Sequence, residues 1–525
     1  MSLKQQANKG SEVDEQLAAL ITNSNAVRAI SSSVEGTLGP KGLDTMLVDR
    51  YGDVVITNDG VTILTLMEAN HPAARMLINV ARAQQDEIGD GTTTATIMAG
   101  TMVSTGVDQV ARGVPVARVI EGLRFGFQHG LRLMQARVRP VDDMDDPVLK
   151  QVALVAGRGY LDIADLVVEA ARLVGKEKIV DPNFKFSDTV VAEEGSDNKV
   201  FSGVIINKEP VSRQTPKKFN HAGVLVIDDA LEPEEIEPEA LATEAGFNLS
   251  LELKEHFKQN LQKLASAGVS MVLVDRSVHD LAEEILTDAG IMVVERVSNR
   301  ELHRAAEHTG ARIIKRTALK RSINDICGFL GRTDKVFHDE KLKQVWLTGG
   351  QGKPMATVLV GAATAEVVGE RERIARDAAS AVQASLRGGV VPGGGSLELA
   401  VAREIEREKA GLKGMTVFGV DCVIEALKRP MSQIVANAGF NPLEKMGDVT
   451  AAQVEAGLDS LGIDCDSGTV SDMYRLGVID PAPVKTYAFK AAGEIAEAIL
   501  RIDTIIKKKE EQEGARVDVD KIIPQ

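Results

Sequence analysis

The sequence GDGTTTAT at residues 89–96 indicates a glycine turn that leads directly into a helix. Gly89 and Gly91 allow positive φ angles and let backbone amides approach an anion, while the first amides of a helix carry partial positive charge. The carboxylate of Asp90 would repel an anion in such a loop unless a divalent cation such as Mg²⁺ lies between them. The stretch therefore favours a loop that binds a metal–nucleotide complex, with the threonine hydroxyls as further donors.

Taken alone, this motif has an ordinary alternative, which is a helix capped by Asp or Thr after a glycine turn. The best-known nucleotide loop does not decide between them, because the pattern GxxxxGK[ST] is absent from the sequence. The run GGQGK at residues 349–353 has the wrong spacing, is followed by Pro354, and indicates a hairpin turn.

Three further segments are rich in glycine or turn residues. They are GTLGPKG at residues 36–42, TNDGVT at residues 57–62 and VVPGGG at residues 390–395. The second follows a predicted strand hairpin formed by residues 45–48 and 54–57, so Asp59 has the simpler explanation that it starts a turn. Each segment is weak evidence by itself.

The composition describes a large acidic protein with an aliphatic core. The 525 residues are enough for two or three domains, and only 3% of them are aromatic. The net charge of −15 argues against a general nucleic-acid binder, because phosphate backbones are held by basic surfaces. The three cysteines form no CxxC pair and suggest small buried residues in a reducing compartment. With no signal peptide and no long apolar run, we expect a cytoplasmic protein without a membrane span.

Helical periodicity dominates the first and last quarters of the chain, and short β-rich runs occupy its middle. The predicted helices include residues 75–87, 95–111, 115–136 and 487–508. The predicted strands of the middle are residues 223–227, 269–274, 291–294 and 311–314. The chain thus combines a helical body, made from both ends, with an α/β insert.

Together these motifs closely resemble one family. The sequences EGTLGPKG, TNDGVTIL, GDGTTTAT, VVPGGG and GVIDP at residues 477–481 occur in the order and at the spacing of the chaperonins, the Hsp60 superfamily. The resemblance covers essentially the whole chain. It is strongest to the lidded, thermosome-like group II type, because the chain lacks the glycine–methionine tail of the bacterial type and carries extra sequence in its middle third. The divergent bacterial group III branch is a second candidate within that lidded group.

The resemblance implies a multidomain chaperonin fold with a mainly helical equatorial domain, a small α/β intermediate domain and an α/β apical domain with a helical protrusion. The implied boundaries are 1–141 and 389–525 for the equatorial ATP-binding domain, 142–208 and 360–388 for the intermediate hinge domain, and 209–359 for the apical substrate-binding domain, with a built-in lid protrusion at about 231–258. The chain would then run out to the apical tip and return.

The segment at residues 231–256 begins with glutamates and continues with Phe247, Leu249, Leu251 and Leu253, which are apolar at every second residue. This pattern leaves two interpretations open: a strand or helix packed into the core of its domain, or an exposed edge that meets neighbouring subunits. In lidded chaperonins this position is the protrusion that closes the chamber. The resemblance therefore favours a lid, and it implies no separate co-chaperonin.

ATP hydrolysis requires a group that activates water, and the resemblance assigns this role to Asp377. From the pattern alone, Asp377 borders the apolar stripe of a helix at residues 371–387 and is more simply explained as a solvated acid. In chaperonins the aspartate at this distance before VVPGGG positions or deprotonates the attacking water. Asp59 matches the second acid near the γ-phosphate.

The resemblance also assigns nucleotide contacts residue by residue. The matching positions are Thr37, Leu38, Gly39, Pro40, Asp90, Gly91, Thr92, Thr93, Thr94, Gly393, Gly394 and Asp480. Among them Asp90 matches the Mg²⁺ ligand, and the cofactors implied are ATP and Mg²⁺, with K⁺ as a further candidate. Asp480 matches the ribose contact, where many lidded relatives have Glu, and its simpler role is a cap before Pro481.

One position departs from the pattern of the lidded chaperonins. They usually present a lysine to the γ-phosphate from the segment that here is AGRG at residues 156–159, so Arg158 stands where lysine is expected. A guanidinium can hold two phosphate oxygens at once, whereas an ammonium is a compact point charge, so the sensing of ATP against ADP would change. The alternative is a surface arginine in a flexible turn.

The function implied by the resemblance is that of a Mg²⁺-dependent ATPase and molecular chaperone. It would enclose unfolded client proteins in a double-ring chamber and promote their folding through ATP-driven lid closure. The expected assembly is a homo-oligomer of stacked rings with about eight subunits each, without nucleic-acid or membrane partners. Two rivals stay open: a metabolic enzyme that uses ATP to phosphorylate a small molecule, and a non-hydrolysing scaffold built on the same ring fold.

Overall fold

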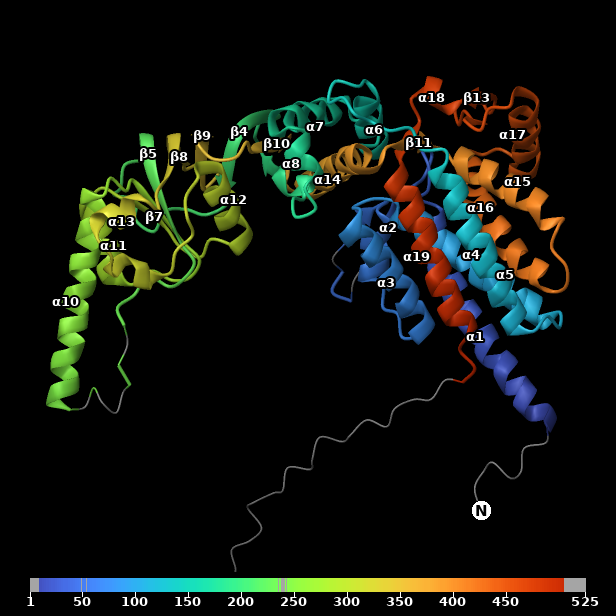
Figure 1. Ribbon diagram of the computed structural model, residues 1–525, viewed down its shortest axis with the longest axis horizontal. Coiled ribbons are helices and arrows are strands. Elements are labelled where there is room, and N and C mark those ends of the chain that lie inside the picture. Colours follow the sequence, from blue (N-terminus) through green and yellow to red (C-terminus); the bar gives the residue numbers. More distant parts are fainter. Residues whose placement is uncertain are drawn as a thin grey trace, which may run out of the picture.

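The computed structural model describes residues 9–48, 50–52, 54–234, 236–237, 241 and 243–504. The remaining portions of the predicted equatorial domain and lid protrusion lie outside the described residues. The helix predicted at 487–508 ends at Leu500, so the prediction was too long, and its residues 505–508 lie outside the described part. Figure 1 shows an elongated molecule with three parts in a row, in which the first and last elements of the chain lie together at one end. The chain therefore runs outward through a middle part to an outer part and returns.

The helical body is built from both ends of the chain. Its helices are α1 (Lys9–Glu35), α2 (Gly60–Leu66), α3 (Pro72–Glu87), α4 (Thr92–Ala111), α5 (Val116–Gln135), α15 (Ser396–Lys409), α16 (Thr416–Asn437), α17 (Pro442–Ala456), α18 (Met473–Leu476) and α19 (Ala482–Leu500). The helices predicted at 75–87, 95–111 and 115–136 are confirmed as α3, α4 and α5. Where α5 meets α16, a Cβ on Gly122 would lie 2.7 Å from the Cα of Gly419, so glycine allows a close approach of the two backbones. Small and aliphatic residues thus fill this core.

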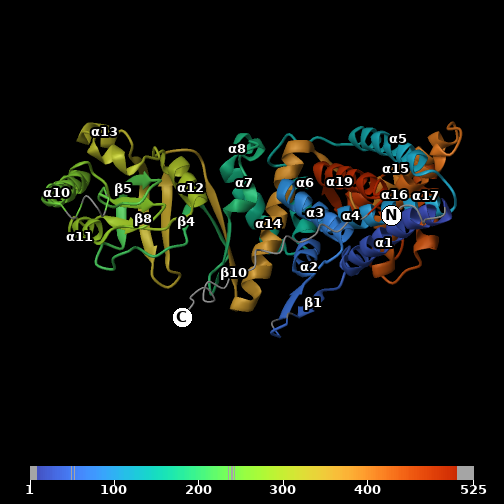
Figure 2. The same cartoon turned by 90° about the horizontal axis from the view of Figure 1, so that it is seen from below.

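Short antiparallel strand pairs connect the helices of the body. They are β1 (Thr45–Val48) with β2 (Val54–Thr57), β11 (Val390–Pro392) with β14 (Ile479–Pro481), and β12 (Leu461–Ile463) with β13 (Val470–Asp472). The first pair confirms the predicted hairpin and extends away from the body in Figure 2. The second pair brings together two of the sequence motifs, which lie far apart along the chain.

The middle part packs helices beside one end of a sheet. Its elements are α6 (Val148–Ala156), α7 (Leu161–Val174), α8 (Lys176–Val180), the 3₁₀ helix η2 (Phe186–Thr189), β3 (Val190–Glu194) and α14 (Ala365–Gly388). Helix α14 contacts α6 and α7 and also α19 of the body, and Figure 2 shows it between these two parts. The predicted apolar stripe of this helix, formed by Ile374, Ala378, Val382 and Leu386, is buried as expected.

One eight-stranded sheet crosses from the middle part into the outer part. Its order is β3, β10 (Ala356–Ala362), β4 (Lys199–Ile206), β9 (Gln344–Gly350), β8 (Gly331–Asp339), β5 (Lys218–Ile227), β6 (Met271–Val274) and β7 (Met292–Val294). The β3–β10, β5–β6 and β6–β7 pairs are parallel, and the other pairs are antiparallel. Strand β4 pairs with β10 on one side and with β9 on the other, so it joins the two parts through backbone hydrogen bonds.

Helices of the outer part cover its section of this sheet. They are α10 (Glu244–Ser266), α11 (Asp280–Asp288), α12 (Asn299–Thr309), the 3₁₀ helix η3 (Arg316–Lys320) and α13 (Ile323–Cys327). The predicted strands at 223–227, 269–274 and 291–294 are confirmed within β5, β6 and β7. Residues 311–314 instead form only an isolated bridge, Ile314 with Ile227, so that prediction of a strand was wrong.

The long helix α10 projects beyond the outer part in Figure 1. Its C-terminal half packs inward through Phe257 and Leu261, whereas Phe247 and Leu251 near its N-terminus are 55% and 51% exposed. The alternating apolar residues therefore do not belong to a strand, because an α-helix distributes every second residue around its surface. The interpretation as a packed core segment is also wrong for this half of the helix.

Two smaller predictions need correction. Residues 349–353 do not form a hairpin turn between β9 and β10, because β4 lies between those strands in the sheet. Cys422 is buried, but Cys327 is exposed, so the cysteines are not uniformly buried as expected.

None of the helices in the described part of the chain combines the length and apolar character that crossing a membrane requires.

His308 is buried at the end of α12, where this helix meets β9. Its Nε2 accepts a hydrogen bond of 3.0 Å from the amide of Gly350, so the neutral ring is the form that fits. A second proton on the ring would remove this acceptor. Burial, with a smaller effect from the charge of Arg304, lowers the pKa of His308 to about 4, although a hydrogen bond with the backbone of Lys353 opposes this shift.

This shift predicts a pH-dependent stability of the outer part. Because the pKa of His308 in the fold lies below its value of 6.5 in an unfolded chain, its contribution is lost as the pH falls below 6.5. At pH 5 the loss should be about 2 kcal/mol relative to pH 7.5. Thermal unfolding of His308→Gln should therefore show a smaller acid shift than the unmodified protein. The exposed His303 on the same helix provides the control, and an equal acid shift in His308→Gln would contradict the assignment.

Candidate active site

The glycine turn at residues 89–96 has the predicted form. Gly89 and Gly91 adopt φ angles of 85° and 80°, and Gly91 is the N-cap of α4 without a side-chain capping bond. The amide of Gly91 donates to Oδ1 of Asp90 at 2.6 Å, and Nε2 of Gln84 donates to the carbonyl oxygen of Asp90 at 2.6 Å. The alternative of a side-chain cap is therefore wrong, and the first amides of α4 carry no capping side chain.

Asp59 lies at the start of α2, against the N-terminus of α4. Its Oδ2 accepts hydrogen bonds from the amide and the hydroxyl of Thr62, at 3.0 and 2.6 Å, so Asp59 caps α2. The next residue, Gly60, packs so tightly against the hydroxyl of Thr93 that a Cβ would clash with it. Asp59, which the sequence suggested as the start of a turn, is thus the N-cap of α2, and the contact of Gly60 with Thr93 brings it beside the glycine turn at residues 89–91.

Helix α14 brings Asp377 to this loop from the middle part. Ser380, one turn further along α14, contacts Gly89, where a Cβ would lie 2.7 Å from the serine Cβ. Burial raises the pKa of Asp377 well above its ordinary value, and the charges of Asp90 and Asp59 raise it further. Asp377 is only partly exposed, so the interpretation as a fully solvated acid does not hold.

Asp90 is the second acid of this cluster with a raised pKa. Burial raises the pKa of Asp90 to about 6, and the charges of Asp480 and Asp59 add to this effect, while the Gly91 amide and Lys485 oppose it. Such repulsion between neighbouring carboxylates is relieved by a cation. In the described residues no group of three or more His, Cys, Asp or Glu side chains is arranged to hold a metal ion alone. The charge of the clustered carboxylates is nevertheless compatible with a divalent cation near Asp90.

The turn at residues 36–42 is fixed by α16. Nδ2 of Asn437 donates to the carbonyl oxygens of Glu35 and Leu38, at 2.9 and 2.8 Å. Gly39 has a φ of 87° and lies against Ile434, where a Cβ would approach to 3.1 Å. Thr37 is buried and Pro40 is exposed in this turn. The four predicted residues 37–40 thus form a rigid loop on the body.

The predicted positions 393, 394 and 480 meet at the β11–β14 pair. Asp480 is paired with Val391, and the amide of Gly393 donates to the carbonyl oxygen of Val478 at 2.9 Å. A Cβ on Gly393 would lie 2.9 Å from Oδ2 of Asp480. Asp480 makes no capping bond to α19, whose N-cap is Pro481, so its simpler predicted role is wrong.

Two charged residues near Asp480 were missed in the sequence. Nζ of Lys485 lies 2.8 Å from Oδ2 of Asp480 and 2.8 Å from Oε1 of Glu398. Lys485 stands in the first turns of α19, where a cation opposes the helix dipole. This unfavourable position of a lysine could have marked Lys485 in the sequence as a residue with a buried partner. The partner itself, Glu398, could not have been identified, because it is distant in the sequence.

Arg158 lies in the turn between α6 and α7, with a left-handed φ of 53°. It forms an ion pair with Glu370 on α14, which also pairs with Arg373 at 2.6 Å. Arg373 in turn donates to the hydroxyl of Thr57 at 2.8 Å. Arg158 is therefore not a free surface arginine, and a chain of polar contacts connects it to the strand that precedes Asp59.

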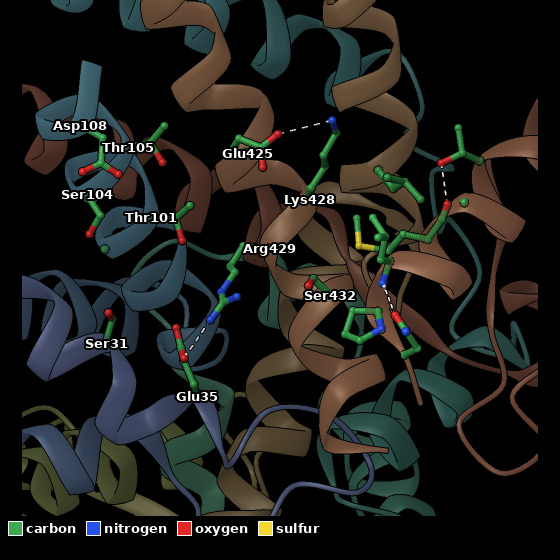
Figure 3. Close-up of a pocket in the computed structure, with 18 of the residues that line it drawn as sticks. Ser31, Glu35, Thr101, Ser104, Thr105, Asp108, Glu425, Lys428, Arg429 and Ser432 are labelled. Atoms are coloured by element: carbon green, nitrogen blue, oxygen red, sulfur yellow. Dashed lines mark hydrogen bonds and ion pairs between the residues drawn. The ribbon is translucent and has the colours of Figure 1, made fainter. Parts of the chain in front are cut away.

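The site described above is distinct from a large hollow on the helical body. Figure 3 shows this hollow of about 1330 Å³ between α1, α4, α16 and α17, lined by Ser31, Glu35, Thr101 and Arg429 among others. Glu35 and Arg429 pair across it at 2.9 Å. None of the predicted site residues lines this hollow.

Comparisons with known proteins agree with this geometry. The model of the TCP-1/cpn60 chaperonin family matches residues 30–510. The thermosome subunit of Pyrococcus abyssi is 35% identical over 515 residues, covering 94% of this chain and 92% of its own. The thermosome subunit beta of Archaeoglobus fulgidus is 34% identical over 503 residues, covering 93% and 91%. The crystal structure of a group III chaperonin in the open state superposes with a TM-score of 0.84 at 46% identity, covering 94% of this chain and all of that one.

The chain belongs to the TCP-1/cpn60 chaperonin family and has the multidomain chaperonin fold of a group II-like member. It is an ATP-dependent chaperone and an ATPase, and it binds nucleotide, as members of this family do. The same membership implies assembly into oligomeric rings that bind unfolded client proteins. The resemblance inferred from the sequence motifs is thereby confirmed, and the two rival functions are set aside.

Proposed function

We propose that ATP binds with Mg²⁺ where α4, the loop at residues 36–42 and the β11–β14 pair meet. The observation that carries this proposal is the gathering of Asp59, Asp90 and Asp377 beside the uncapped N-terminus of α4. Helix amides attract phosphate, whereas three carboxylates repel it, so the combination suits a phosphate accompanied by a cation. When bound, Mg²⁺ would neutralise charge on the phosphates and the carboxylates, with Asp90 as its ligand; K⁺ is a further candidate.

The remaining contacts follow from the surrounding elements. The phosphates would be held by the amides and hydroxyls of residues 91–94. Residues 37–40 would lie against the nucleotide. Gly393 and Gly394 would line the base and ribose, and Asp480 would accept hydrogen bonds from the ribose. The close contact between Gly393 and Asp480 supports this, because it leaves no room for a side chain at position 393.

Asp377 is proposed as the residue that positions and deprotonates the attacking water, with Asp59 as the second acid. A carboxylate whose pKa is raised by burial and by neighbouring acids is a stronger base than an exposed one. Because Asp377 belongs to α14, it enters the site from a different part of the molecule than the phosphate loop does. Hydrolysis would thus depend on how the middle part packs against the body.

The three parts of the structure would serve as chaperonin domains with the boundaries given by the motifs. The body at 1–141 and 389–525 would be the equatorial domain, 142–208 and 360–388 the intermediate domain, and 209–359 the apical domain. The exposed apolar residues on the projecting half of α10 support a built-in lid at about 231–258, without a separate co-chaperonin. We further propose double rings of about eight subunits each in the cytoplasm.

Replacement of the proposed base tests the catalytic assignment. Asp377→Asn keeps the shape of the side chain but cannot accept a proton, so ATP hydrolysis should fall by about 10²- to 10⁴-fold. Nucleotide binding and native mass should be unchanged, which calorimetry and light scattering would measure. Glu372→Ala on the same helix is the matched control, because Glu372 pairs with Arg376 rather than with the acid cluster. Normal hydrolysis by Asp377→Asn would exclude Asp377 as the base.

Arg158 is proposed to sense the γ-phosphate through its link to α14. Arg158→Ala removes the partner of Glu370, so hydrolysis should continue while ATP-driven closure is lost. Closure can be followed by protection of the α10 segment from protease after addition of ATP. Arg172→Ala, in an exposed pair with Asp145, provides the control. Unchanged closure in Arg158→Ala would contradict the sensor role.

The native mass tests the proposed ring. Two eight-membered rings of the 56.2 kDa chain would give a particle of about 900 kDa in light scattering. A mass of about 790 kDa would indicate seven-membered rings instead and overturn the proposed symmetry. A stable monomer or dimer with Mg²⁺ and ATP present would contradict the ring itself.

A further inference from the structure

Lys485 is buried between the carboxylates of Glu398 and Asp480, and its charge also acts on Asp90 of the glycine turn. Its side chain is 9% exposed, and that of Glu398 is 1% exposed. The ammonium lies 2.8 Å from one oxygen of Glu398 and 2.8 Å from Oδ2 of Asp480. A buried cation of this kind is retained only where its partners compensate the loss of water.

The position of Lys485 is fixed by Glu398. Within the described part of the chain, neither carboxylate oxygen of Glu398 has a hydrogen-bond partner of good geometry, so the ammonium of Lys485 is what compensates its charge. Glu398 lies in the first turn of α15 and Lys485 near the start of α19. The pair therefore connects the two helices that follow the glycine segment and the Asp480 strand.

Asp480 is held by this pair through only one of its oxygens. Oδ2 contacts Lys485 and lies against the backbone of Gly393. The ion pair with Lys485 is made by Oδ2 rather than by Oδ1. One ammonium faces two carboxylates, so a negative charge is left on Asp480.

We propose that Lys485, anchored by Glu398, is a positioning residue for the nucleotide sugar. It fixes Oδ2 of Asp480 and so holds the other oxygen ready to accept hydrogen bonds from the sugar hydroxyls. Lys485 itself does not touch the nucleotide. The inference rests on the proposed function, because it assumes that Asp480 is the ribose contact.

The test compares two ligands that differ only in these hydroxyls, ADP and 2′,3′-dideoxy-ADP, by calorimetry with Mg²⁺ on the full chain. The unmodified protein should bind ADP about tenfold or more tightly than the dideoxy analogue, as expected for hydrogen bonds to a charged acceptor. In Lys485→Met, the ratio of the two affinities should fall to about one, because the loss of charge compensation at Asp90 affects both ligands alike whereas the loss of the Asp480 anchor affects ADP alone. A general disturbance of the site would weaken both ligands equally.

A second variant protects the test against failure to fold. In Lys485→Met combined with Glu398→Leu, the fully buried carboxylate of Glu398 is not left without a partner, while Asp480 still loses its anchor. This double variant should likewise lose the preference for ADP over 2′,3′-dideoxy-ADP. Lys409→Met, which breaks a pair with Asp421 on neighbouring helices of the body, is the matched control and should keep the preference for ADP.

The outcomes separate this inference from the proposed function. Retained discrimination in both Lys485 variants would overturn the positioning role while leaving the nucleotide site intact. Equal weakening of both ligands would also overturn it, because it would show a structural role only. If the unmodified protein bound ADP without preference over the analogue, Asp480 would not be the ribose contact and the inference would fall with it. No binding of either ligand would contradict the proposed site as a whole.

Discussion

The concentration of negative charge beside the N-terminus of α4 is the constraint on which the rest of the site depends. Asp59, Asp90 and Asp377 each raise the free energy of ionising another member of the cluster, and burial strengthens this repulsion. The fold offsets part of the cost with positive charge from three sides: the amides that open α4, Lys485 near Asp90, and Arg158 with Arg373 near Asp377. On the proposed function, a cation would complete this balance, so the site would take its phosphate together with a metal ion.

The same constraint explains why the junction between the body and the middle part matters. One hydrophobic core continues from α6, α7 and α14 into the strands and α12 of the outer part, whereas the body has a separate core of its own. The shared sheet reinforces this division, since β4 pairs with β10 on the side of the middle part and with β9 on the side of the outer part. Any change at Asp377 therefore acts at the boundary between two cores, and the core of the middle part would carry it as a stiff unit into the strands of the outer part, on whose other core α10 packs.

Local chemistry made much of this molecule predictable. A glycine turn, a two-strand hairpin and the amphipathic helices are set by neighbouring residues, so residues 89–96 and the stripe on α14 were predicted correctly. Predictions failed where distant partners decide the outcome. The alternation in α10 left a packed core segment and an exposed edge equally open, because the pattern alone does not show that half of this helix projects from its domain. Lys485 was missed because its partner Glu398 is brought to it only by the pairing of β11 with β14.

The Lys485–Glu398 ion pair and the Arg158–Glu370 ion pair differ in how deeply they are buried. The side chains of Lys485 and Glu398 are 9% and 1% exposed, so separating them would leave charges without water or partner, and the pair must stay closed. The side chains of Arg158 and Glu370 are 25% and 32% exposed, so water can compensate either charge when the pair opens. If Arg158 is the proposed sensor, it would exchange a carboxylate for a phosphate at small cost, while Asp480 would keep its position. The proposed site would then have a rigid end that suits recognition of an unchanging sugar, and an adaptable end that suits a phosphate present in ATP and absent in ADP.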